Sequence, residues 1–304
     1  MVCIYTVAES WLNDRATNDN RGQLLSLYMV VTYIGVGAGQ LLLLLADPAG
    51  DRLFMLTAIL YGLCLVPIAL ASGEAPKNIG TERLKFRALY RLSPVGVVGA
   101  AAAGFANSPL MGLGPVFGVS VGFNVEQVSY FMAIFLLGSL ALQIPIGRLS
   151  DRFDRRGVLI GVAAASCIAC ICMAVFVSLG YWLIMGLSFV IGGLSAVIYP
   201  IAMAHSNDHA KPETMVSIMA GLLLAFGIGA SISPFLASLA MKGLGPVGLY
   251  IYTAAVYALL AGFTLYRRSQ RPAVAEQSDF VAQPQTSQSS AAMTTLDPRT
   301  DDSD

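Results

Sequence analysis

The chain alternates long apolar runs with short polar segments. Crossing the hydrocarbon core of a bilayer, about 30 Å thick, takes roughly 20 apolar residues at about 1.5 Å each. Eight runs approach this length, and we expect each to be a membrane helix because unsatisfied backbone groups are too costly in lipid. The predicted spans are residues 23–46, 53–71, 94–119, 128–146, 157–179, 181–204, 214–241 and 247–266.

The two ends of the chain differ from these runs. Residues 1–12 are mostly apolar, but twelve residues make only about 18 Å of helix, so we interpret them as the last part of a helix whose beginning is absent. Residues 267–304 are rich in Ser, Gln, Thr, Pro and Asp. Such a segment cannot bury a core, and we expect a disordered tail.

Composition excludes an ordinary soluble enzyme. Hydrophobic residues make up 56% of the chain and charged residues 12%, with a mean hydropathy of +0.69, whereas soluble domains carry about 25% charged residues. The net charge is zero, so no basic excess exists to bind nucleic acid. The sequence therefore predicts an all-α polytopic membrane protein.

Neither a metal site nor a cofactor motif is indicated. The five cysteines all lie in apolar runs. His205 and His209 are four residues apart with Asp208 between them, but no third clear ligand accompanies them, and we interpret this segment as a solvated loop.

The basic residues predict an orientation. All but two of the 18 Lys and Arg residues fall in alternate gaps between the spans, and none lies inside a span. The two exceptions are Arg52 and Lys242. By the positive-inside rule, the side with the many cations, which includes the C-terminal tail, is cytoplasmic.

A weak internal repeat points to two related halves. At a shift of 192 residues, the glycine-rich run 35–39 overlies 227–231, and the polar segment 13–21 overlies 205–213. Repeats of this kind build transporter halves, and two six-helix halves would leave roughly 100 residues missing at the N-terminus. The alternative is an eight-helix protein with a short re-entrant start.

The segment 147–156, which we call the signature segment, reads Gly-Arg-Leu-Ser-Asp-Arg-Phe-Asp-Arg-Arg. It resembles the cytoplasmic signature loop of the major facilitator superfamily, G-x-L-[AS]-D-[RK]-x-G-[RK]-[RK], except that Asp154 replaces a glycine. Further segments, at 9–13, 20–25, 39–42 and 199–204, resemble the YcaD-like branch of that family. The resemblance covers roughly residues 5–266.

This resemblance implies a twelve-helix fold of two halves, of which helices 1–3 and part of helix 4 are lacking here. Eight full transmembrane helices plus a half helix would be present. The implied parts are 1–71, a remnant of the N-terminal half; 72–93, a cytoplasmic interdomain loop; 94–266, a complete C-terminal six-helix half; and 267–304, the cytoplasmic tail.

The resemblance also implies a function. It indicates secondary active transport of a small solute across the inner membrane by alternating access, driven by a proton or solute gradient, with no enzymatic activity. The few polar groups in the spans favour efflux of an amphipathic compound. The expected partners are a small-molecule substrate and membrane lipid, and the expected state is a monomer. Two alternatives stay open, an inactive truncated remnant and a membrane scaffold without transport.

Two groups of candidate residues follow. By the resemblance, Asp151 would lie near the start of the helix at 22 and latch the cytoplasmic side, because a carboxylate there meets free N–H groups and the positive end of the helix dipole. The expected gating group is Gly147, Asp151, Arg152, Arg155, Arg156 and Arg21. We expect glycine to be tolerated at position 154, the usual glycine position.

The second group is polar residues within apolar segments, which are functional candidates by default. The candidates for a substrate or proton path are Glu9, Gln40, Asn107 and Gln143. The alternative for Glu9 is a structural bond to a group such as Arg21. The alternative for the other three is a hydrogen bond between helices.

The orientation is directly testable. Single cysteines at Ser150, Asp51 and Lys242 should separate by side: an impermeant thiol reagent added to intact cells should label positions 51 and 242 and spare 150. Labelling of position 150 together with protection of position 51 would reverse the assignment.

Overall fold

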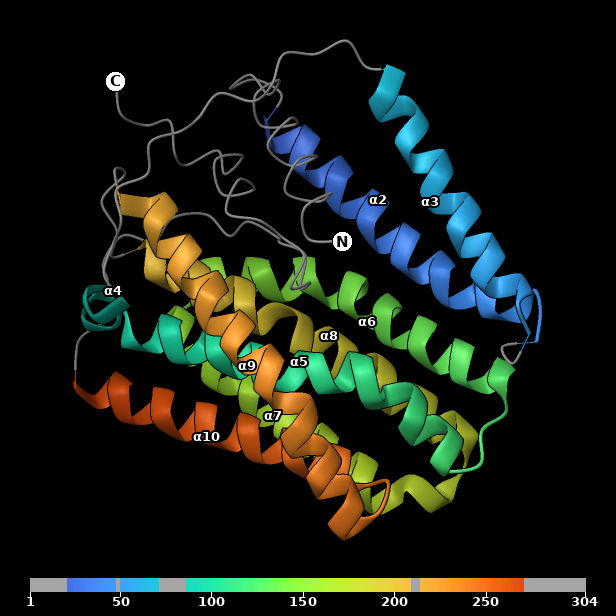
Figure 1. Cartoon of the computed structure of the whole chain (residues 1–304). Helices are drawn as coiled ribbons and strands as arrows, with labels where there is room; N and C mark the ends of the chain where they lie inside the picture. Colours follow the sequence, from blue (N-terminus) through green and yellow to red (C-terminus); the bar gives the residue numbers. More distant parts are fainter. Residues whose placement is uncertain (1–20, 48–49, 71–85, 209–213, 271–304) are drawn as a thin grey trace.

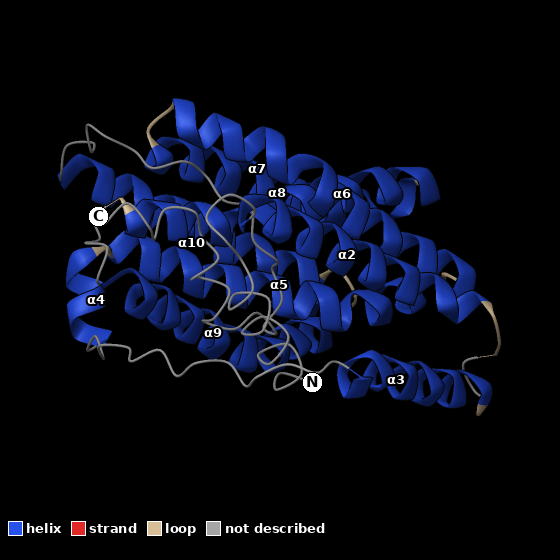
Figure 2. Ribbon diagram, turned by 90° about the horizontal axis from the view of Figure 1, so that it is seen from above, coloured by secondary structure: helices blue, strands red, loops and turns tan. Residues whose placement is uncertain are grey.

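The computed structural model describes residues 21–47, 50–70, 86–208 and 214–270, and these residues form helices and short connections without a strand (Figure 2). This confirms the predicted all-α class. The helices are α2 (Arg21–Leu41), α3 (Arg52–Leu70), α4 (Phe86–Leu92), α5 (Pro94–Ser120), α6 (Val125–Arg152), α7 (Arg155–Phe176), α8 (Tyr181–Asn207), α9 (Met215–Leu244) and α10 (Gly248–Gln270), with 3-10 turns η1 (Leu42–Leu44) and η2 (Val177–Leu179).

Six helices of the described part, α5 to α10, are long and apolar enough to cross a membrane. The stretches Ile34–Leu44 and Arg52–Pro67 are shorter apolar helices, and α4 is an additional short helix where we expected a loop. The expected count of eight full spans plus a half helix is therefore not supported. An apolar run sets an approximate length, but local turns decide where a helix ends, as where α2 tightens into η1.

The ends of the long helices follow from capping residues. Ser93 caps α5 by accepting a hydrogen bond from the Gly96 N–H at 3.2 Å. At α6, Asn124 and Gln127 form a capping box, each side chain bonded to the other residue's backbone N–H. Between η2 and α8, Gly180 adopts φ +119°, which only glycine reaches easily. These devices place the breaks close to the ends of the predicted spans.

The six long helices pack mainly as three pairs, α5 with α9, α6 with α8, and α7 with α10. Backbones approach closely within the α5–α9 and α6–α8 pairs because glycines lie at the crossings. A Cβ at Gly138 of α6 would overlap the Phe189 carbonyl of α8, and one at Gly104 of α5 would overlap the Phe226 carbonyl of α9. Small residues at such crossings hold membrane helices together, since lipid provides no hydrophobic force between them.

Helices α2 and α3 pack less closely. In both overall views α3 lies apart from the six-helix bundle (Figures 1 and 2), and in Figure 1 α2, which packs against α6, lies between α3 and the bundle. The described side chains of α3 are exposed except for the half-buried Leu53 and Leu56. The glycine-rich run 35–39 of the internal repeat makes no close approach, because a Cβ at any of its three glycines would meet nothing within 4 Å.

The α6–α8 crossing generates a stability prediction. Gly192→Ala places a Cβ against the Phe135 carbonyl, so the helices must separate, at about 1–3 kcal/mol. Gly186→Ala on the same helix α8 is the matched control, because a Cβ there meets nothing within 4 Å, and the substitution gains up to about 1 kcal/mol of helix propensity. Thermal unfolding in detergent should rank Gly186→Ala at or above the parent and Gly192→Ala below it. Equal stability of the two variants would show that the close crossing is unimportant.

Candidate functional site

The signature segment is mostly helical. Helix α6 continues through the buried Gly147 to Arg152, and α7 begins at Arg155, so the connection is only Phe153 and Asp154. Our expectation of a ten-residue loop was wrong in this respect. Asp154 has φ −51°, in the ordinary region for any residue, which explains why this chain needs no glycine there.

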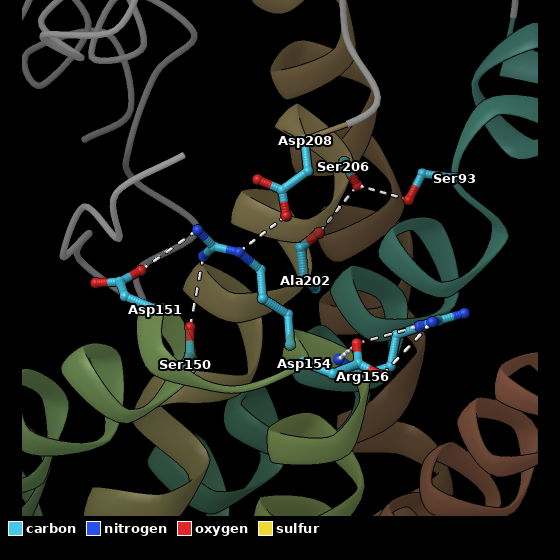
Figure 3. A network of polar contacts seen from close by, with 9 residues as sticks. Ser93, Ser150, Asp151, Asp154, Arg156, Ala202, Ser206 and Asp208 are labelled. Carbon is cyan, nitrogen blue, oxygen red and sulfur yellow. Dashed lines mark hydrogen bonds and ion pairs between the residues drawn. The ribbon is translucent and has the colours of Figure 1, made fainter. Parts of the chain in front are cut away.

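Arg155 is the centre of the segment. Its side chain is 1% exposed. The Nε atom lies 2.9 Å from Asp208 Oδ2 and Nη2 lies 3.3 Å from Asp151 Oδ1, both as ion pairs, and Nη1 donates to Ser150 Oγ at 3.4 Å. Figure 3 shows Asp151, Ser150 and Asp208 turned toward one region, with dashed lines marking these contacts. One guanidinium group thus joins the end of α6, the start of α7 and the end of α8.

Burial determines the electrostatics of the Arg155–Asp208 contact. Asp208 is only 2% exposed at its side chain, so a lone carboxylate or a lone guanidinium here would pay a large desolvation penalty. The two groups neutralise each other where neither can reach water. Asp151 is 28% exposed, so its ion pair with Arg155 is the outer and more strongly screened of the two. The result is an inner fixed pair with a second carboxylate at its edge.

Asp154 organises a second set of contacts. Its Oδ1 accepts a hydrogen bond from the Arg156 N–H at 3.1 Å, which caps α7, and lies 3.3 Å from Arg156 Nε. Its other oxygen, Oδ2, lies 3.4 Å from Nε of Arg268 on α10, whose side chain is half exposed. Asp154→Gly removes a helix cap and two ion pairs, together worth about 1 kcal/mol, so tolerance of glycine here stays a prediction and would come with a small loss of stability.

A hydroxyl pair ties α5 into the same end of the bundle. Ser206 Oγ and Ser93 Oγ lie 3.1 Å apart, and the Ser206 hydroxyl also lies 2.9 Å from the Ala202 carbonyl (Figure 3). Gly96 makes this approach possible, since a Cβ at that position would overlap Ser206 Oγ. We call this end of the molecule, where α5 and α7 begin and α6 and α8 end, the Arg155 end.

The predicted gating residues differ in their contacts. Asp151 and Arg155 are brought into direct contact, and Arg156 instead pairs with Asp154. Arg152 is exposed, and the side chain of Arg21 lies outside the described residues. Ser150 is fully buried, so the exposed Phe153 is the better cysteine position for the labelling experiment proposed above.

The predicted path residues lie on three separate helices. Asn107 on α5 is 4% exposed, and its Nδ2 has no hydrogen-bond partner among the described residues. Gln143 on α6 is 2% exposed, and Gln40 on α2 is half-buried. Glu9 lies outside the described residues. A buried amide donor without a partner is costly, by about 1–3 kcal/mol, which marks Asn107 as the strongest of these candidates.

Sequence reasoning missed Asp208. We considered it only as a spacer between two histidines in a solvated loop, whereas it is buried against Arg155, and His205 is 8% exposed inside α8. A usable signal existed: an acidic residue at the end of a span is notable where the facing segment carries adjacent arginines. Within the described residues no group of three or more His, Cys, Asp or Glu is arranged to hold a metal ion.

The six long apolar helices define the class of protein, a multi-pass α-helical membrane protein. The Major Facilitator Superfamily matches residues 96–294, which is most of the chain, and the chain therefore belongs to that family. The family consists of membrane transporters, so this protein is a transporter family member and not an enzyme.

Similar proteins agree with this assignment. An "Uncharacterized MFS-type transporter YcaD" of Escherichia fergusonii is 28% identical over 255 residues, which cover 83% of this chain and 65% of that relative. Its counterpart in Salmonella heidelberg is 27% identical over 273 residues, which cover 88% of this chain and 70% of that relative. An MFS-type transporter of Enterobacter sp. (strain 638) is 27% identical over 274 residues. The chain thus spans about two thirds of the length of these relatives, and the YcaD-like resemblance is confirmed.

The Arg155–Asp208 pair generates a second prediction. Asp208→Asn leaves a buried guanidinium without its inner partner and should lower the free energy of unfolding by about 3–5 kcal/mol. Arg155→Gln should cost a similar amount, while the double variant should cost less than the sum, because neither member of the inner pair is left as an unpaired buried charge. Arg152→Gln, at an exposed position, is the control and should be neutral. If the loss in the free energy of unfolding measured in detergent for the double variant equals the sum of the losses for the two single variants, the two residues are not a coupled pair.

Proposed function

We propose that this chain carries out, as part of a secondary active transporter, the movement of a small solute across a bacterial inner membrane by alternating access. Family membership supports transport of a solute. The observation that carries the mechanism is the ion-pair network in which Arg155 joins Asp151 and Asp208 across three helix ends. The driving force in this proposal is a proton or solute gradient.

In the proposed mechanism the inner pair is structural and the outer pair is the switch. Arg155 and Asp208 stay together and hold α7 and α8 as one body. Asp151 lies at the partly exposed edge of the network, on α6, the helix that α2 packs against. A carboxylate at this position can form or lose contacts across the α2–α6 boundary with a small change in free energy. A switch between two conformations requires such a small difference. Closure of the Arg155 end corresponds to the state open on the opposite side.

The substrate path in this proposal runs between the two halves, with Asn107 as its best-supported polar contact. Its unpartnered amide can bond a solute without first breaking a protein hydrogen bond. Glu9, Gln40 and Gln143 stay candidates for the same path. The predominance of apolar residues in the described helices favours an amphipathic compound and export. The Arg155 end and the C-terminus are cytoplasmic in this account, on the strength of the Lys and Arg distribution.

The mechanism predicts a change in access that needs no known substrate. In a background with the five native cysteines replaced, Asn107→Cys should react with an impermeant thiol reagent from the side to which the path is open. Adding Asp151→Asn weakens closure of the Arg155 end, so labelling in inside-out vesicles should rise severalfold while labelling in intact cells falls. Leu259→Cys is the matched control: this residue is 74% exposed in the middle of the apolar helix α10, where lipid would shield a thiol, so it should react poorly from both sides.

Two results would count against the mechanism. Equal labelling with and without Asp151→Asn would remove the switch role of this carboxylate. If position 107 is labelled from neither side, with or without Asp151→Asn, Asn107 lies in a core closed to water. Its role would then be packing, and no transport path would pass this residue.

A further inference from the structure

Helix α4 lies across the end of the bundle. The long helices α5 to α10 run roughly along one direction, and in both overall views α4 lies beyond the Arg155 end and runs across that direction (Figures 1 and 2). It ends at Leu92, immediately before the Ser93 cap of α5. Because α5 crosses the membrane, a helix placed across its first residues lies in the plane of the membrane surface.

One face of α4 is fixed to the bundle. Leu89 is 1% exposed, and α4 contacts α5 and α9. On α9, a Cβ at Gly221 would overlap Leu89 Cδ2, so the leucine side chain fills the space that this glycine leaves. A single buried side chain thus sets the rotation of α4 about its own axis.

The opposite face of α4 is basic and open. Arg87 and Arg91 are four residues apart, so they share one face, and each is about 200° around the helix from Leu89. Both are exposed, as is Tyr90 at 44%. No described carboxylate lies within ion-pair distance of either guanidinium group. Two cations and a tyrosine in this arrangement match the interfacial region of a bilayer, where aromatic rings and basic side chains gather.

We propose that α4 is a membrane-surface anchor whose Arg87 and Arg91 bind the head-group phosphate of an anionic phospholipid. Charge complementarity carries the choice of ligand: two guanidinium groups spaced one helical turn apart present forked donors to phosphate oxygens, and an anionic surface attracts each one. This site is separate from the network around Arg155, and it depends neither on the direction of transport nor on transport itself.

The anchor has a mechanical consequence. Since Leu89 packs at Gly221 on α9 and α4 leads directly into α5, bound lipid holds the starts of both helices at the bilayer surface. These two helices form one of the three main packing pairs of the bundle. Lipid bound to α4 therefore restrains the α5–α9 pair as a unit.

Native mass spectrometry of the purified full chain in neutral detergent tests the proposal, with phosphatidylglycerol, phosphatidylcholine and inorganic phosphate as probes. The parent should prefer phosphatidylglycerol. The double variant Arg87→Gln/Arg91→Gln should bind its tightest phosphatidylglycerol about 30-fold more weakly. This value follows because each arginine contributes about 1 kcal/mol and a tenfold change in affinity corresponds to about 1.4 kcal/mol. Arg87→Lys/Arg91→Lys should retain most of the binding, since its charge is unchanged.

The matched control is Arg52→Gln/Lys242→Gln, which removes the same charge from exposed positions away from the Arg155 end. It should leave phosphatidylglycerol binding unchanged. Binding by Arg87→Gln/Arg91→Gln within about threefold of the parent, or an equal loss in the control, would overturn the proposal. Displacement of phosphatidylglycerol by millimolar inorganic phosphate would overturn the choice of ligand, since it would indicate a site for a soluble anion. A transport-inactive chain that still shows the 30-fold effect would leave the anchor standing and count only against the proposed function.

Discussion

A single buried cation determines how the helices meet at one end of this protein. Arg155 has its side chain almost wholly removed from solvent, and Asp208 and Asp151 supply compensating charge to it from two other helices. The short connection between α6 and α7 depends on the same residue, since α7 begins with it. One guanidinium group therefore joins the ends of α6 and α8 to the start of α7.

Away from that end, packing is a matter of small residues and not of charge. Glycines at the α5–α9 and α6–α8 crossings let backbones approach to contact, and their positions leave no room for a Cβ. A bundle held by such close fits moves as a body, since packed interfaces rearrange in discrete steps and do not stretch continuously. The ionic network and the glycine crossings are thus complementary: the crossings fix the α5–α9 and α6–α8 pairs, and Asp151 lies on α6, the helix that α2 packs against.

Much of the fold could be predicted from the length and spacing of the apolar runs. All six long helices lie where the hydrophobic runs are, and the residues of the signature segment led to the correct family. What could not be predicted are features that depend on contacts between distant residues. Asp208 acquires its role only when the end of α8 meets Arg155, and α4 is stabilised by the fit of Leu89 at Gly221, which no local pattern reveals. The glycine expected at position 154 proved unnecessary because the observed turn keeps φ negative.

The central claim is that the α2–α6 boundary opens and closes at the Arg155 end under the control of Asp151. The most direct measurement is the distance distribution between spin labels at Leu27 on α2 and Phe153 beyond α6, both about 60% exposed, by pulsed electron paramagnetic resonance of the chain in a lipid bilayer. The account predicts two distance populations in the parent and a gain of the longer one in Asp151→Asn. One narrow population, unchanged by Asp151→Asn, would contradict it.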